Sequence, residues 1–76
     1  MHWQQYISVN PKVLFGKPVI KGTRIAVDLI VEKFASGETM EDILESYPHL
    51  SKEKILACLA YASEVLKCET HLPLVS

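Results

Sequence analysis

The sequence has no long hydrophobic run, little cysteine and no large excess of charge of either sign. No apolar stretch among its 76 residues approaches the roughly 20 that cross a bilayer, so no membrane contact is expected. Residues 1–5 have neither a basic start nor an apolar stretch, so no signal peptide is predicted. The two cysteines, Cys58 and Cys68, form no disulfide-rich pattern, which favours a cytoplasmic protein with reduced thiols.

The composition is that of a small globular domain. Hydrophobic residues make up 49% of the chain and charged residues 22%, a balance too apolar for intrinsic disorder. Residues 1–76 form a single domain, and a chain this short buries only about 60% of the surface that its unfolded form exposes. A second subunit would add buried area, so we expect a homodimer.

The formal charge of −1 conceals an asymmetry along the chain. Residues 1–26 carry four cations and no acid, for a charge of +4, whereas residues 27–50 carry one lysine and six acids, for a charge of −5. The remaining residues are balanced. The basic and acidic segments can pair with each other, or the basic arm can face an anion, of which nucleic acid is the commonest large one.

Turn residues divide the basic arm, residues 1–26, into short apolar segments. Residues 6–9, 13–15 and 19–20 are rich in β-branched and aromatic side chains and are bounded by Gly, Pro or Asn. This pattern predicts two or three short β-strands separated by turns. Such strands are marginal alone, so they need a helix or the strands of another subunit against them.

From residue 27 onward the apolar spacing becomes helical, which predicts a three-helix unit over residues 27–67. Apolar residues recur at i, i+3, i+4 and i+7 in residues 27–34 and again in residues 40–47. The first of these helices ends at Gly37, and the second begins at Thr39 with a near capping box and stops at the following proline.

The third predicted helix begins at the N-cap Ser51 and carries two lines of apolar residues. One line contains Ile55, Leu59, Ala62 and Leu66, and the other contains Cys58, Tyr61 and Val65. Three short helices cannot easily bury both lines. The second line is therefore either covered by the N-terminal strands or is a subunit or partner interface.

The C-terminal tail, residues 68–76, is a second candidate for contact with a partner protein. It is apolar and contains a proline, and we expect Leu72, Leu74 and Val75 to make this contact by adding a strand to a sheet edge.

The short turn between the second and third helices resembles that of a helix-turn-helix unit. In that geometry the first turn of the last helix faces DNA, which places Ser51, Lys52 and Lys54 near phosphates. The third helix lacks arginine and the chain is acidic overall, both of which weigh against DNA binding. Three-helix units also occur without a nucleic-acid role.

The most distinctive string is GKPVIKGTRI at residues 16–25, in which two glycines and a proline set the turns. It lacks the Gly-Lys-Ser/Thr of a phosphate-binding P-loop. Together with residues 7–11, Gly37 and the Tyr47-Pro48 pair, it resembles the domain-of-unknown-function (DUF) 433 family of short prokaryotic proteins. The resemblance covers about residues 6–61.

This resemblance implies a mainly α, homeodomain-like fold with short N-terminal β-strands, and a binding protein rather than a catalyst. It further implies a VapB-like antitoxin of a type II toxin-antitoxin pair, which neutralises a PIN-like nuclease toxin and binds operator DNA as a homodimer. The string supplies the remaining DNA-binding candidates, which are Lys17, Lys21, Thr23 and Arg24. Arg24 can alternatively pair with Asp28. A protein-interaction module without DNA binding is the alternative function.

The residues that carry enzyme chemistry are not grouped in the sequence. No Ser/His/Asp grouping is visible, and the Cys68-x-x-His71 pair provides only half of a zinc site. The acids Glu41, Asp42 and Glu45 are those of a solvated helix face. We therefore expect no enzyme activity, no metal and no cofactor.

Overall fold

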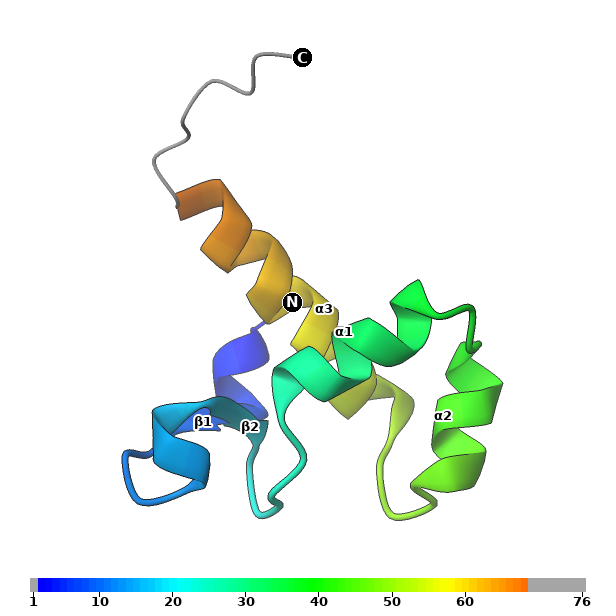
Figure 1. Ribbon diagram of the computed structural model, residues 1–76, viewed down its shortest axis with the longest axis horizontal. Helices are drawn as coiled ribbons and strands as arrows, with labels where there is room; N and C mark the ends of the chain where they lie inside the picture. Colours follow the sequence, from blue (N-terminus) through cyan, green and yellow to red (C-terminus); the bar gives the residue numbers. More distant parts are fainter. Residues whose placement is uncertain (1, 69–76) are drawn as a thin grey trace.

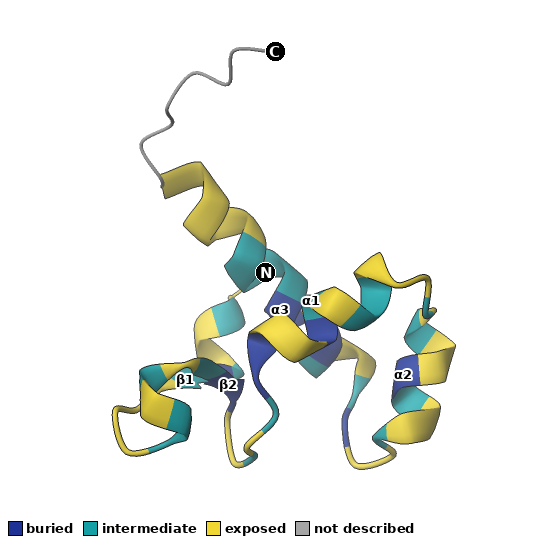
Figure 2. Cartoon of the chain, in the orientation of Figure 1, coloured by how far each residue is buried: buried dark blue, intermediate teal, exposed yellow. Residues whose placement is uncertain are grey.

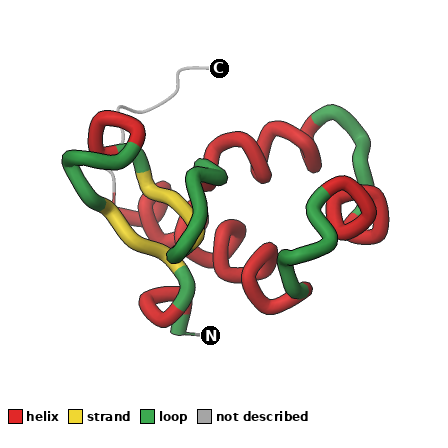
Figure 3. Tube along the Cα trace, turned by 90° about the horizontal axis from the view of Figure 1, so that it is seen from below, coloured by secondary structure: helices red, strands yellow, loops and turns green. Residues whose placement is uncertain are grey.

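The computed structural model describes residues 2–68, which are mainly helical, with three α-helices and a short pair of strands (Figure 1). The elements are β1 (Ile7–Val9), β2 (Pro18–Ile20), α1 (Val27–Ala35), α2 (Met40–Ser46) and α3 (Lys52–Cys68). A 3-10 turn at Trp3–Gln5 precedes β1 and packs against α3. Seen from below, the strand pair lies at one end of the molecule and α2 lies at the other (Figure 3).

The two strands are antiparallel, and Ile7 pairs with Ile20. Val19 makes a further bridge to Ala26, which ties the strand pair to the start of α1. Ile7, Val19 and Ile20 are buried because α1 and α3 lie against the strands. The predicted strands at residues 6–9 and 19–20 are thus present, and a helix of the same chain provides the cover that they need.

The strand predicted at residues 13–15 is wrong. Residues Leu14–Gly16 form a left-handed 3-10 turn, in which φ is 48° at Leu14, 57° at Phe15 and 84° at Gly16. Extended strands require negative φ, so this segment cannot join the sheet. Hydrogen bonds from Val13 N to Asn10 O (2.9 Å) and from Gly16 N to Val13 O (3.0 Å) close the turn.

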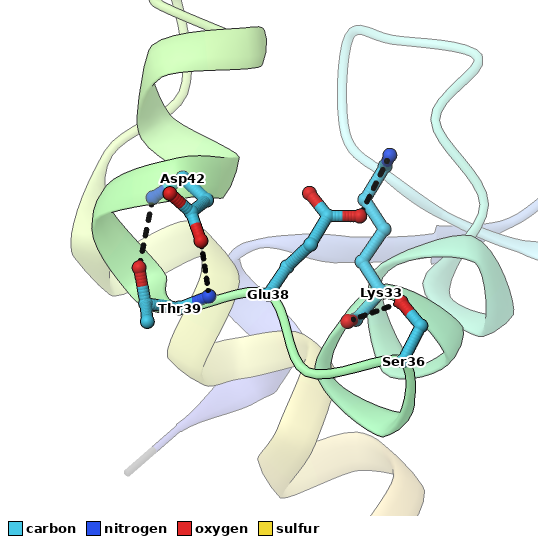
Figure 4. A network of polar contacts seen from close by, with 5 residues as sticks. All are labelled: Lys33, Ser36, Glu38, Thr39 and Asp42. Carbon is cyan, nitrogen blue, oxygen red and sulfur yellow. Dashed lines mark hydrogen bonds and ion pairs between the residues drawn. The ribbon is translucent and has the colours of Figure 1, made fainter.

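The link from α1 to α2 follows from its sequence. Gly37 has a φ of 98°, and its N–H donates to Phe34 O while the N–H of Glu38 donates to Lys33 O, each at 3.0 Å. These two bonds satisfy carbonyls that α1 would otherwise leave free. The Lys33 ammonium also lies 3.5 Å from the Glu38 carboxylate, next to the cap of α2 (Figure 4).

The predicted helix starts are confirmed. The Thr39 hydroxyl accepts from Asp42 N at 3.1 Å, and the Asp42 carboxylate accepts from Thr39 N at 2.9 Å, which completes a capping box (Figure 4). At α3 the Ser51 hydroxyl accepts from Lys54 N at 3.3 Å. The short turn between α2 and α3 is closed by Leu50 N donating to Tyr47 O at 2.9 Å.

One core joins all of these elements. It consists of Ile7, Ile20, Val27, Ile30, Ile43, Leu50, Ile55, Ala57 and Cys58. The first half of α3 therefore belongs to the core, whereas its second half extends past the other elements and is mostly exposed (Figures 1 and 2).

Candidate protein-docking groove

A shallow apolar groove lies between α1 and the second half of α3. We call it the α1–α3 groove. It has a volume of about 410 Å³ and is lined by Pro18, Val27, Asp28, Val31, Glu32, Tyr61, Ala62, Val65 and Leu66. Two of its apolar residues remain well exposed, Val65 at 41% and Leu66 at 61%. An apolar concave surface of this kind is a candidate site of protein or ligand contact.

The groove follows from the unequal lengths of the two helices. At 1.5 Å per residue, the 17 residues of α3 span about 25 Å and the nine of α1 span about 14 Å. Ile30, Ile55 and Cys58 are fully buried in the shared core, but α1 does not extend far enough to cover residues 62–66. These residues keep the apolar spacing of a buried helix, but α1 does not cover them.

The N-terminal segment covers a different side of α3. The Trp3 ring meets the Tyr61 ring edge to face, with centroids 4.7 Å apart, and the Trp3 indole N–H donates to the Glu64 carboxylate. The predicted cover of the second apolar line by the N-terminal part of the chain is therefore present in part. The N-terminal segment packs on Tyr61, although through a 3-10 turn and not through the strands, while Val65 stays open.

The prediction that Cys58 contacts a partner is wrong. Its side chain is fully buried, because α3 turns this position toward the shared core. Burial raises the pKa of the Cys58 thiol from 9.0 to about 11, so the thiol is neutral at physiological pH. Tyr61 and Val65, the other two candidates on this line, do line the groove. Leu72, Leu74 and Val75 lie outside the described residues.

Acidic side chains from α1 form the polar edge of the groove. Asp28 and Glu32 are both exposed on α1, and Lys17 lies 3.0 Å from Asp28. The predicted alternative pairing of Arg24 with Asp28 is thus replaced by Lys17. The reason is local: Lys17 directly precedes β2, which packs against α1, and it reaches the first turn of that helix.

The DNA-binding candidates lie on two separate elements. Lys21, Thr23 and Arg24 occupy the turn between β2 and α1, and Lys52 and Lys54 lie in the first turn of α3. Lys17, Lys21, Arg24 and Lys52 are exposed, and Lys54 is half-buried.

The two hydroxyl candidates hold the backbone. The Thr23 hydroxyl donates to Ile20 O at 2.7 Å and accepts from Ile25 N at 3.0 Å. The Ser51 hydroxyl caps α3. Their local bonds explain why these residue types occur at these positions.

The sequence reasoning missed two features. The apolar spacing of α1 predicts only that Val27 and Val31 face the core, and it does not predict that they line a groove. The sequence does not show where α1 stops covering α3. Phe15 was assigned to a strand but is fully exposed, at 103%. The signal for the second was present, because Asn10-Pro11 and Gly16-Lys17-Pro18 place turn-forming residues on both sides of it.

Residues 2–68 contain neither a metal-binding cluster nor a membrane-spanning helix. Within this range no group of three His, Cys, Asp or Glu side chains is arranged to hold a metal ion. No helix in the same range is long and apolar enough to span a membrane.

Comparisons with known proteins match the family expected from the sequence. The profile of DUF433, described as a protein of unknown function, matches residues 7–62. The uncharacterized protein y4eO of Sinorhizobium fredii is 36% identical over 59 residues, which cover 78% of this chain and 27% of that protein. A crystal structure of a DUF433 member from Anabaena variabilis, at 2.00 Å resolution, aligns with a TM-score of 0.79 and 30% identity, covering 84% of this chain and 63% of that one. The chain thus spans less than two thirds of the length of each relative, and it belongs to the DUF433 family.

Proposed function

We propose that this protein is a non-catalytic binding protein that docks another protein on the α1–α3 groove. The observation that carries the proposal is the exposed apolar lining of the groove, with Val65 and Leu66 uncovered beside Val27 and Val31 of α1. Burying such a surface against a partner is favourable by about 25 cal/mol for each Å² of apolar area removed from water.

We further propose that the chain is an antitoxin. The DUF433 resemblance supports a type II toxin-antitoxin pair in which this chain neutralises a PIN-like nuclease toxin. On this view the nuclease contacts the groove or the C-terminal tail, residues 68–76, and the protein acts in the cytoplasm. Neither role requires a catalytic group of its own.

Co-purification with a nuclease encoded beside this chain tests the proposal. Val65→Asp places a charge in the groove and is expected to reduce the captured protein at least tenfold. Leu56→Asp is the matched control, because Leu56 lies on the same helix with nearly equal exposure, 40% against 41%, and does not line the groove. Equal capture by both variants would contradict the groove as the docking site. Deleting residues 70–76 separately tests the tail.

DNA binding is a second candidate function. The cations of the N-terminal arm, Lys12, Lys17, Lys21 and Arg24, are all exposed, and the order α2, short turn, α3 is that of a helix-turn-helix unit. A homeodomain-like reading of this unit places Lys52 near DNA. Together these groups favour contact with phosphates over base readout, because lysine ammonium groups are point charges.

A gel-shift titration on the DNA upstream of the gene tests this second candidate, with and without the partner protein. Binding is expected to weaken steeply with salt, and a Lys21→Ala, Arg24→Ala double variant is expected to reduce the salt slope by about 2. Lys67→Ala, at the other end of α3, serves as the control. Absence of salt-sensitive binding in both conditions would exclude the DNA role.

A further inference from the structure

The turn at Leu14–Gly16 presents one aromatic side chain entirely to solvent. Phe15 is 103% exposed, so it contacts nothing in its own chain, including the groove. Its φ of 57° and ψ of 34° are left-handed, as is the φ of 48° at Leu14. Bulky residues rarely adopt this conformation, and each instance costs of order 1 kcal/mol. Strain that displays an uncovered aromatic ring points to a role outside the fold.

Further hydrogen bonds brace the turn. In addition to the two bonds that close it, the Asn10 side chain accepts from Lys12 N at 2.9 Å, and Lys17 N donates to Leu14 O at 3.2 Å. A rigid loop holds an exposed side chain in one position, which reduces the entropy lost when that side chain is buried against a partner. Phe15 is thus presented in the way that an interface anchor requires.

The α1–α3 groove complements this turn in shape and in charge. Its lining is apolar and its volume of about 410 Å³ is ample for a phenylalanine side chain. Its edge carries the exposed acids Asp28 and Glu32, whereas the turn is flanked by the exposed cations Lys12 and Lys17. Lys17 already pairs with Asp28 of its own chain, which leaves Lys12 of one copy to face Glu32 of the other.

We propose that the occupant of the groove is the Phe15 turn of a second copy of this chain. If each copy inserts its Phe15 into the other, the interface is two-fold symmetric and closes as a dimer. This inference rests on the proposed function in that it takes the same groove as a protein-docking site. The second copy occupies the groove when no nuclease is bound, and a nuclease would compete with it for the same surface.

Photo-crosslinking of the full chain tests the pairing directly. Replacing Phe15 with p-benzoylphenylalanine keeps an aromatic ring at this position and makes it reactive toward nearby C–H bonds. Irradiation is expected to give a covalent dimer, with the attachment mapped by mass spectrometry to residues 27–32 or 61–66. Attachment at any other segment, or the absence of a covalent dimer at high concentration, would overturn the proposal.

Sedimentation measurements on variants provide a second readout. Phe15→Asn removes the ring, and asparagine tolerates the left-handed conformation, so the variant is expected to stay folded while its dimer weakens by roughly a hundredfold or more. Val65→Asp should weaken the dimer and Leu56→Asp should not. A Phe15→Asn variant that dimerises as tightly as the natural sequence refutes this inference. If Phe15→Asn dimerises normally but Val65→Asp still reduces nuclease capture, the proposed function stands and the groove has another occupant.

Discussion

The Trp3 ring lies edge to face against the Tyr61 ring, 4.7 Å between centroids, and so fastens the N-terminal segment to the middle of α3. The contact joins residues far apart in the sequence. It holds the segment that leads into β1 against the helix that forms one wall of the α1–α3 groove. The N-terminal segment is therefore part of the folded body, and it contacts Tyr61, one of the residues that line the groove.

Trp3→Ala is expected to destabilise the protein by about 2 kcal/mol, because it removes a half-buried ring and its aromatic contact. Urea unfolding measures the loss. It is followed by circular dichroism and not by fluorescence, because Trp3 is the single tryptophan of the chain and the variant lacks it. Trp3→Phe keeps an edge-to-face ring and should lose less. Equal stability of Trp3→Ala and the natural sequence would show that the segment is not fastened to α3.

Ile43→Ala is expected to cost about 2–4 kcal/mol, because Ile43 is fully buried and is the one buried residue of α2. That is a large share of the stability of a small domain. Thermal unfolding measures the effect, and Ile43→Val, which removes one methylene, should cost about 1 kcal/mol. A loss below 1 kcal/mol for the alanine variant would mean that α2 does not pack on the core as described.

Thr39→Ala is expected to cost about 1 kcal/mol and to lower the melting temperature by about 4–8 °C. The hydroxyl caps α2, and its removal leaves the N–H of Asp42 without that acceptor. Thr39→Ser retains the hydroxyl and should unfold close to the natural sequence. A melting temperature unaffected by the alanine substitution would contradict the capping box.

Cys58 is expected to make stability fall at alkaline pH. The pKa of the buried thiol is about 11, against 9.0 when the thiol is exposed on unfolding, so the folded state holds this proton more tightly. The resulting stabilisation is complete below pH 9 and is lost as the pH rises through 11.

Chemical denaturation at several pH values between 8 and 11 measures this loss. Cys58→Ala lacks the thiol and should show a shallower decline, which isolates the contribution of Cys58. In the folded protein a thiol reagent should modify the exposed Cys68 and leave Cys58 untouched. Rapid modification of Cys58 would contradict its burial.

The helices were predictable from sequence because local chemistry sets their ends. Gly37, Thr39 and Ser51 each act within a few residues of their own position, so the signal needs no tertiary information. The structure of the three short segments of the basic arm was harder to predict. Residues 7–9 and 18–20 do form strands, but the left-handed turn at Phe15 depends on how the chain closes between them.

The groove could be predicted only in part. The apolar line through Tyr61 and Val65 was visible in the sequence, as was the choice between cover and exposure. Which member of the line faces the core depends on how α3 is rotated against α1, and Cys58 was misassigned for that reason. The ion pair of Asp28 with Lys17 depends on the position of β2 against α1. The spacing of charges along the chain does not specify that position.

Amide NMR spectra recorded on dilution test most directly whether the α1–α3 groove binds the Phe15 turn of a second copy. A series from about 1 mM to about 10 µM brackets a micromolar dissociation constant. We expect concentration-dependent shifts for residues 11–17, 27–32 and 61–66, with the amides of α2 unchanged. Spectra that do not change with concentration, or shifts confined to α2, would contradict this binding.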